Sequence, residues 1–267
     1  MNNEDVYVIF LDIDGTLMSG GELVAENVTA IKKAQKRGHK VFINTGRSYS
    51  FIPWKKLADI RFDGVCAGCG SHVVIGDKTL RSVCVDREFL KKTVRYYKEN
   101  DRCIFFEGES RCFWVNPHLY HGSNSMFFSS DLRCQEIKCA EQIDSEFFSE
   151  RISKFTFWES GITSGEKALW REQLRVIEHP SYTESVMYGC NKAVAIECVL
   201  RYLDIPRERS IAMGDSKNDM EMLEYAGISV SMGNATDEVK KMCDYVSADA
   251  SHGGVAKAIY ELLSIDR

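Results

Sequence analysis

The chain has 267 residues, of which 44% are hydrophobic and 27% are charged, and its formal net charge is -5. This composition is typical of a water-soluble globular protein that is long enough to form two domains. The acidic balance excludes the basic surface that attracts nucleic acid. No segment approaches the roughly 20 apolar residues that a membrane span needs. Neither nucleic acid nor a membrane is therefore an expected partner.

The N-terminal residues Met1 to Asp5 contain no basic residue ahead of the first apolar run, unlike a secretory signal. We therefore expect a cytoplasmic protein, in which the ten irregularly spaced cysteines stay reduced and mostly buried. Cys66 and Cys69 form one isolated C-x-x-C with no second pair, so a zinc site is not favoured.

The first predicted element is an apolar run from Val6 to Leu11, which is typical of a buried parallel strand and ends at Asp12-Ile13-Asp14-Gly15-Thr16. Two carboxylates therefore leave the carboxyl end of one strand, which is the edge where open α/β sheets bind ligands. An ordinary strand-ending turn also uses Asp-Gly, so this motif needs support from the rest of the chain.

A βαβ unit is predicted next. Residues 26–37 have helical spacing and Gly38 stops the helix, after which a strand over 41–44 leads into Thr45-Gly46-Arg47-Ser48. The crossover of such a unit is right-handed. The same alternation returns near the C-terminus, and these pieces are expected to join one parallel sheet: a helix over 191–203, a strand over 211–213, a helix over 219–225 and a strand over 228–232.

Residues 81–185 interrupt the regular alternation of strands and helices and are predicted to be an inserted α+β domain. Residues 1–80 and 186–267 are predicted to form the core domain. The insert is expected to contain a helix over 86–97 capped by Asp86, a hairpin of strands over 103–107 and 112–116, a strand over 152–158 and a helix over 166–177. Its aromatic residues are expected mostly to form a core, with one or two left for substrate contact: Phe105, Phe106, Phe113, Trp114, Phe127, Phe128, Phe155 and Trp158.

Four polar signals are predicted to meet at one edge of the core sheet: Asp12 with Asp14, Thr45, Lys192, and the run from Gly214 to Asp219. Each has an ordinary structural alternative. Thr45 is also a possible helix cap, Lys192 a surface lysine, and Ser216 with Asp219 a capping box. These alternatives do not explain why all four signals converge.

The charges of these residues point to a metal ion. Two unit charges 4 Å apart repel by about 4 kcal/mol at an effective dielectric constant near 20, so clustered carboxylates need a positive partner. Mg²⁺ prefers one or two carboxylates together with water and phosphate oxygens. Because Lys192 adds a second positive charge, the cluster favours a phosphoryl group as its ligand.

The four motifs resemble those of the haloacid dehalogenase (HAD) superfamily: Asp-x-Asp-Gly-Thr, Asn-Thr-Gly-Arg, a lone lysine, and Gly-Asp-x-x-Asn-Asp, with Gly254-Val255-Ala256 near the end. The long insert resembles the cap of its Cof-type (C2B) phosphatases. The resemblance implies an α/β fold with a Rossmann-like parallel-sheet core and an inserted α+β cap domain.

By the same resemblance, Asp12 would be the nucleophile that forms an aspartyl-phosphate. Asp14 would be the general acid and then the general base, and therefore needs a raised pKa. Asp12, the backbone carbonyl of Asp14, and Asp215 would hold Mg²⁺. Asp219 would orient Lys192 or a metal-bound water.

The phosphoryl oxygens would be held by Thr45, Gly46, Lys192 and Asn218, the first two at a helix N-terminus suited to anions. One departure from the family stands out, since Cys69-Gly70-Ser71 replaces the usual Asn-Gly-Ala after the strand that precedes the cap. A substrate contact made by that asparagine in relatives is therefore not expected here.

Other functions remain open. A dehalogenase would use Asp12 but needs neither Asp14 nor a metal, and a phosphomutase would move phosphate within a hexose phosphate. A receiver domain accepts phosphate on a later strand and has no such insert. A non-catalytic phosphate-binding protein would be expected to lose Asp12 or Asp14.

We therefore expect a Mg²⁺-dependent phosphatase acting on small phosphorylated metabolites. Sugar phosphates are the substrate class we expect first, followed by cofactor or nucleotide monophosphates. The sequence predicts neither the substrate, whose recognition belongs to the insert, nor the oligomeric state.

Overall fold

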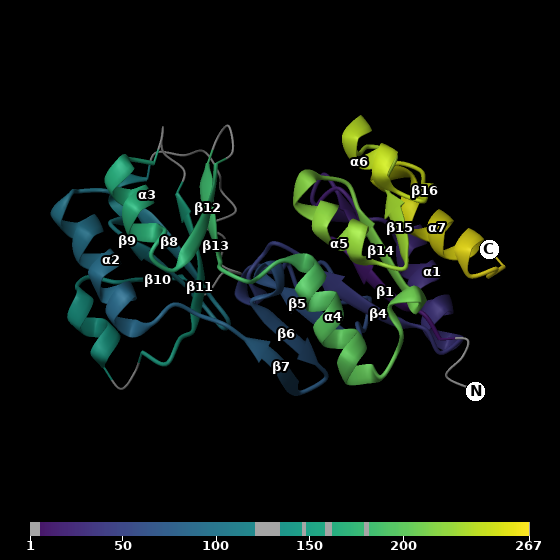
Figure 1. The fold of residues 1–267 in the computed structure, drawn as a ribbon, viewed down its shortest axis with the longest axis horizontal. Helices are drawn as coiled ribbons and strands as arrows, with labels where there is room; N and C mark the ends of the chain where they lie inside the picture. The colour runs from purple at the N-terminus through teal and green to yellow at the C-terminus, as the bar shows by residue number, and fades with distance from the viewer. Residues whose placement is uncertain (1–5, 121–133, 146–147, 158–161, 179–181, 267) are drawn as a thin grey trace. The chain divides into compact units, whose positions relative to one another are not determined.

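The computed structural model describes residues 6–120, 134–145, 148–157, 162–178 and 182–266, which divide into two compact units (Figure 1). The first unit comprises Met1–Gly46, Pro53–Arg81 and Asn191–Arg267, and the second comprises Arg47–Ile52 and Ser82–Cys190. The sequence places the insert at residues 81–185, so the second unit extends further along the chain and also takes in a short segment that follows the second strand of the core.

The first unit is built on an eight-stranded sheet in the order β16-β15-β14-β1-β4-β5-β6-β7. β1 (Val8–Leu11) is central, and it pairs in parallel with β14 (Ser210–Gly214) on one side and β4 (Lys40–Asn44) on the other. The remaining strands are β5 (Gly64–Ala67), β6 (His72–Ile75), β7 (Lys78–Ser82), β15 (Ile228–Ser231) and β16 (Tyr245–Val246). Because β1, β4 and β14 are parallel neighbours, their carboxyl ends meet at one edge of the sheet.

Helices cover both faces of this sheet (Figure 1). α1 (Ala25–Lys36) and α7 (Gly254–Leu262) pack together on one face. α4 (Lys192–Leu203), α5 (Met220–Tyr225) and α6 (Asp237–Met242) lie on the other face, where their apolar side chains join those of β1 in one hydrophobic cluster. A small hairpin of β2 (Met18–Ser19) and β3 (Glu22–Leu23) follows β1. No helix among the described residues is both long and apolar enough to cross a bilayer.

The second unit has a six-stranded sheet in the order β10-β9-β8-β11-β13-β12. Its strands are β8 (Ile104–Gly108), β9 (Cys112–Val115), β10 (Cys134–Glu136), β11 (Ile152–Phe157), β12 (Leu174–Glu178) and β13 (Thr183–Met187). α2 (Arg87–Glu99), α3 (Ser164–Trp170) and the 3₁₀ turn Ala140–Asp144 contribute apolar side chains to a common core with this sheet.

The elements predicted for the core domain are confirmed, and each boundary moves by no more than two residues. In the second unit, the Asp86 carboxylate accepts a hydrogen bond from the Phe89 amide at 2.7 Å, as expected of an N-cap. The predicted hairpin is also confirmed as β8 and β9. Five of the predicted core aromatics are buried, and the others lie outside the described residues, namely Phe127, Phe128 and Trp158, the last residue of the predicted strand 152–158.

The predicted helix over residues 166–177 is wrong in its second half. α3 starts at a capping box of Thr163 and Glu166 but ends at Trp170. Leu174–Glu178 is strand β12, which pairs with all five residues of β13 in antiparallel register. This pairing is long-range information that the local apolar spacing does not contain, and it also explains why a domain boundary at residue 185 would cut a strand.

Candidate active site

A buried lysine lies at the centre of the predicted site. The Lys192 ammonium donates hydrogen bonds to Asp12 Oδ1 at 2.7 Å and Asp219 Oδ1 at 2.5 Å, and the Lys192 side chain is 0% exposed. A longer contact of 3.3 Å joins it to Asn218 Oδ1. Three segments that are far apart in the sequence therefore meet at one ammonium group, as the convergence of motifs predicts.

Lys192 is placed there by the start of α4. Asn191 caps this helix, since its Oδ1 accepts a hydrogen bond from the Val194 amide at 2.8 Å. The side chain of Asn44, the last residue of β4, donates to the Lys192 carbonyl at 2.9 Å. Asn44 is fully buried, and it is the first residue of the Asn-Thr-Gly-Arg motif, in which no role was predicted for the asparagine. Its place in that motif is the signal, but an asparagine at a strand end is too common to identify such a contact.

Asp219 holds both Lys192 and its own loop. Its second oxygen, Oδ2, accepts hydrogen bonds from the backbone amides of Asp215 and Ser216, each at 3.0 Å. Ser216 and Asp219 therefore do form the capping box that the sequence offered as a structural alternative. The two interpretations are compatible, because one carboxylate oxygen shapes the loop and the other binds the lysine.

Three carboxylates gather beside the lysine. Oxygen atoms of Asp12, Asp215 and Asp219 all lie within 4.8 Å of one another. Gly15 makes this approach possible: its φ is +75°, and a Cβ at this position would lie 2.3 Å from Asp215 Oδ2. Thr16 Oγ1 donates to Asp215 Oδ1 at 3.3 Å. Closely spaced carboxylate oxygens are the donor set that a hard divalent cation prefers, so these residues fit such an ion.

Burial disfavours charge on these acids. The pKa of Asp12 is raised to about 7, chiefly by burial and also by the charges of Asp219 and Asp14, against the opposing charge of Lys192. Burial, followed by the Asp219 charge, raises the pKa of Asp215 to about 6. Burial alone would lower the pKa of Lys192, but the charges of Asp12 and Asp219 outweigh it and raise that pKa. Three carboxylates face one ammonium, so the site attracts another cation.

Asp14 is exposed and lies at the edge of this cluster. Its backbone forms an isolated bridge with Met18, and the Gly15 amide donates to the Met18 carbonyl at 3.0 Å, which closes the loop after β1. Asp14 is close enough for its charge to raise the pKa of both Asp12 and Asp215. It therefore belongs to the same group of residues, on the side open to solvent.

Thr45 and Gly46 lie at the carboxyl end of β4, but no α-helix begins there, so the predicted helix N-terminus is wrong. The Thr45 amide donates to the Cys66 carbonyl at 2.9 Å, and the Thr45 carbonyl accepts from the Cys69 amide at 3.1 Å. These bonds tie Thr45 to the end of β5 rather than to a helix. Gly46 lies near Asn218, whose Nδ2 would be 3.7 Å from a Cβ on the glycine.

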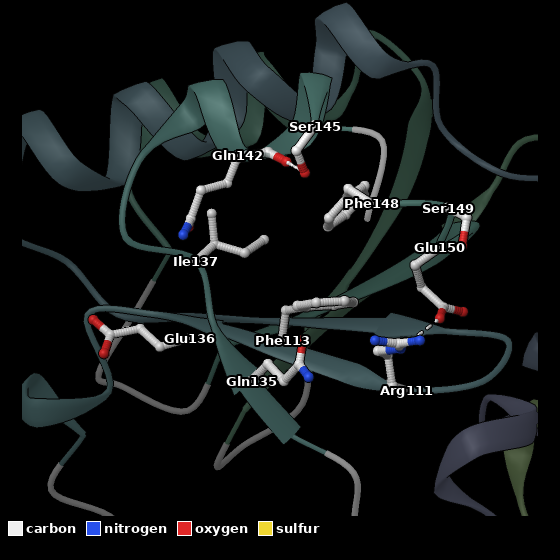
Figure 2. Close-up of a pocket in the computed structure, with 10 residues that line it drawn as sticks. All are labelled: Arg111, Phe113, Gln135, Glu136, Ile137, Gln142, Ser145, Phe148, Ser149 and Glu150. Carbon is white, nitrogen blue, oxygen red and sulfur yellow. Dashed lines mark hydrogen bonds and ion pairs between the residues drawn. The ribbon is translucent and has the colours of Figure 1, made fainter.

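The second unit contains a cavity (Figure 2). It has a volume of about 340 Å³ and is bordered by β9, β10 and the segment that follows them. Its one basic lining residue, Arg111, is paired with Glu150 at 3.5 Å, and the remaining lining residues are apolar, acidic or neutral. This cavity therefore has no uncompensated cation for a phosphoryl group.

The chain resembles known proteins along most of its length. The sequence matches the family model of the haloacid dehalogenase-like hydrolases over residues 9–259. It is 27% identical to 5-amino-6-(5-phospho-D-ribitylamino)uracil phosphatase YitU of Bacillus subtilis, over 97% of this chain and 98% of that protein. It is 25% identical to phosphoglycolate phosphatase 1 of Saccharolobus solfataricus, over 97% of this chain and 96% of that protein.

A longer relative also matches. The sequence is 28% identical to the chloroplastic endoribonuclease YBEY of Arabidopsis thaliana over 94% of this chain, but the matched region is 46% of that protein. The present chain therefore spans about half of this relative.

Solved structures share the fold. A sugar phosphatase of HAD subclass IIB has a TM-score of 0.77 at 24% identity, over 97% of this chain and 100% of that chain. A Thermotoga maritima protein has a TM-score of 0.80 at 19% identity, over 98% of each chain. The predicted fold class, an α/β parallel-sheet core with an inserted α+β domain, is confirmed.

Proposed function

Because this chain belongs to the haloacid dehalogenase-like hydrolases, we propose that it is a Mg²⁺-dependent phosphatase that hydrolyses monoesters of small phosphorylated metabolites through an aspartyl-phosphate. The observation that carries the proposal is the buried Lys192 ammonium, held between Asp12 and Asp219 beside Asp215. This arrangement combines a carboxylate nucleophile, a fixed positive charge and a set of oxygen ligands for a cation. The family resemblance inferred from the motifs is confirmed.

In the first half-reaction, a carboxylate oxygen of Asp12 bonds to phosphorus while the bond between phosphorus and the ester oxygen breaks. Protonated Asp14 gives its proton to the departing oxygen, so a neutral alcohol leaves. In the second half-reaction, Asp14 takes a proton from water, the water oxygen attacks phosphorus, and the Asp12 carboxylate is released with inorganic phosphate. The exposure of Asp14 suits both transfers, since the leaving group and the water arrive from solvent.

Lys192 serves two roles in this proposal. Its ammonium fixes the orientation of Asp12 through the 2.7 Å hydrogen bond, and its charge stabilises the negative charge on the phosphoryl oxygens. Thr45, Gly46 and Asn218 surround the remaining phosphoryl oxygens with polar groups. Because Lys192 is buried, its interactions are weakened little by solvent.

Asp12, the Asp14 backbone carbonyl and Asp215 would hold Mg²⁺, which would neutralise charge on the phosphoryl group during transfer. Asp219 is less suited as a direct ligand, because Lys192 and the amides of its own loop already occupy both of its oxygens. We therefore assign to Asp219 the positioning of Lys192 and of the Asp215 loop.

A phosphate-release screen tests the proposal. We expect the purified protein to release inorganic phosphate from a panel of sugar phosphates, phosphorylated cofactors and nucleoside monophosphates, with Mg²⁺ present and not with EDTA. Two of the relatives named above are phosphatases of small molecules, and a sugar phosphatase shares the fold, so sugar phosphates are tested first. The Asp12→Asn protein serves as the blank. Phosphate release that is equal in the two proteins, or unaffected by EDTA, would contradict the proposal.

Replacing Asp14 with asparagine is expected to lower kcat for a sugar phosphate by about 10²- to 10⁴-fold, because proton transfer to the leaving oxygen is lost. The decrease in the rate of the first half-reaction should be much smaller for p-nitrophenyl phosphate, because its leaving group needs no proton. Rapid-quench measurement of the first turnover separates the two steps, and phosphoenzyme should accumulate because the second step lacks its base. An unchanged kcat on the sugar phosphate would exclude Asp14 as the acid.

The phosphomutase alternative is less favoured, because the two relatives that match along nearly their whole length, from Bacillus subtilis and Saccharolobus solfataricus, are named phosphatases. It is tested in the same screen by comparing free phosphate with isomer formation from one hexose phosphate. A non-catalytic phosphate-binding role is disfavoured because Asp12 and Asp14 are both present.

A further inference from the structure

Asn234 joins three loops at the edge of the sheet where the proposed active site lies. It follows β15, the strand next to β14, so its loop lies beside the one that carries Asp215. Its side-chain Nδ2 donates to the Gly15 carbonyl at 2.9 Å and lies 3.5 Å from Asp215 Oδ2. Its Oδ1 accepts from the Ala250 amide at 2.7 Å. Both ends of the carboxamide are therefore used.

The donor end of Asn234 faces the two loops that carry the acidic groups. The loop after β1 bears Asp12 and Asp14, and Gly15 brings its backbone against Asp215. Like charges on these two loops repel each other: the charge of Asp14 contributes to the raised pKa of Asp215, although burial and the charge of Asp219 are the larger causes. A neutral N–H donor that bonds the Gly15 carbonyl and points at Asp215 opposes this separation without adding negative charge.

We propose that Asn234 is a positioning residue for the divalent cation, because it holds the Gly15 loop against Asp215 and so sets the spacing between the ligands on the two loops. The inference rests on the proposed function for the identity of the cation. Asn234 acts through the positions of other residues and is not itself a ligand in this proposal. Groups that orient metal ligands commonly change metal affinity by about 10- to 100-fold when they are removed.

A purely structural role makes a different prediction. If Asn234 only anchors Ala250, which begins the 3₁₀ turn Ala250–His252, its loss would lower stability and leave cation affinity unchanged. Asn234→Asp separates the two ends of the side chain, since it keeps the acceptor for the Ala250 amide and loses the donor to Gly15. Asn234→Asp also brings a negative charge next to Asp215, and this charge changes the cation affinity independently of the lost donor. Asn234→Ala is therefore the main test.

The experiment measures Mg²⁺ binding to the full chain by calorimetry, without substrate, and thermal unfolding with and without Mg²⁺. We expect Asn234→Ala to bind Mg²⁺ about 10-fold or more weakly, with a small change in the Tm of the metal-free protein. Asn234→Asp should keep the metal-free Tm at a pH where the neighbouring acids are protonated and lower it at pH 8. Ser251→Ala, which alters an exposed side chain beside Ala250, is the matched control and should bind Mg²⁺ as the wild type does.

Activity assays then distinguish an effect on Mg²⁺ binding from an effect on substrate binding or on the chemical step. When Mg²⁺ is varied at saturating substrate, the Asn234→Ala protein should need a higher Mg²⁺ concentration for its half-maximal rate. At high Mg²⁺ its kcat should approach that of the wild type, and its KM for substrate should be nearly unchanged. Wild-type Mg²⁺ affinity in Asn234→Ala would overturn the inference, and so would the absence of Mg²⁺ binding to the wild-type chain. If the wild type binds Mg²⁺ and Asn234→Ala binds it weakly, but no ester is hydrolysed, the positioning role stands and the phosphatase proposal fails.

Discussion

The Asp12→Asn protein is expected to lose turnover by about 10⁴-fold or more and yet to resist unfolding at least as well as the metal-free wild type at pH 8. Loss of activity follows because an amide oxygen cannot form the acyl phosphate intermediate, and removing a nucleophile abolishes the chemical step rather than weakening binding. The fold should survive, since asparagine keeps the shape of the side chain and an oxygen that accepts a hydrogen bond from Lys192.

The gain in stability follows from the raised pKa of Asp12, which is about 7 in the folded protein and 3.8 in its reference state. A carboxyl group whose pKa is raised by folding stabilises the folded state most below pH 3.8, and this contribution is lost as the pH rises through 7. At pH 8 the buried carboxylate therefore opposes folding, by an amount on the order of a few kcal/mol, whereas the asparagine stays neutral.

Urea unfolding in EDTA at pH 5.5 and pH 8 measures this effect. The free energy of unfolding of Asp12→Asn should exceed that of the wild type at pH 8, and the difference should shrink at pH 5.5, where the wild-type carboxyl is protonated. Saturating Mg²⁺ should stabilise the wild type more than the variant, because the variant has lost a charged ligand. A variant that is clearly less stable than the wild type at pH 8 would show that Asp12 is paired favourably by Lys192 without a metal.

The parts of the fold that sequence reasoning predicted correctly are those with strong local signals. β1 is apolar throughout and β14 is buried throughout, because both faces of the sheet are covered by helices, and the polar run that follows each strand is abrupt. The carboxyl-edge rule then brings Asp12 and Asp215 together without any knowledge of side-chain positions. Lys192 was identified from its motif context, since nothing in its own neighbourhood distinguishes it from a surface lysine.

The parts that could not be predicted depend on long-range contacts. Whether residues 174–178 form a helix or a strand is decided by pairing with β13, and the same pairing places β13 within the second unit. Thr45 was expected at a helix N-terminus from the family resemblance, but its backbone bonds to Cys66 and Cys69 instead. Asn234 follows a predicted strand at the same edge as the other motifs, and that position is the signal that would have found it.

Lys192→Met is expected to destabilise the metal-free protein by about 3–5 kcal/mol at pH 8, in addition to abolishing activity. Removing one partner of a buried ion pair leaves an uncompensated charge, which costs more than the pair itself contributes. Here the loss of the ammonium leaves Asp12, Asp215 and Asp219 with no cation among them. The raised pKa of Lys192 means that its ammonium is fully charged in the wild type from pH 5.5 to pH 8, so its contribution is present throughout this range.

The pH dependence of the variant distinguishes this cause from a simple packing defect. Lowering the pH to 5.5 protonates Asp12 and Asp215, so most of the deficit at pH 8 should disappear, and Mg²⁺ at pH 8 should recover part of it. Lys217→Met is the matched control. Its ammonium lies 2.8 Å from Glu238, but its side chain is 72% exposed, so its removal should change the free energy of unfolding by less than about 1 kcal/mol. If Lys192→Met were equally destabilised at both pH values, lost packing rather than unpaired charge would be the cause, and the electrostatic account of the site would be wrong.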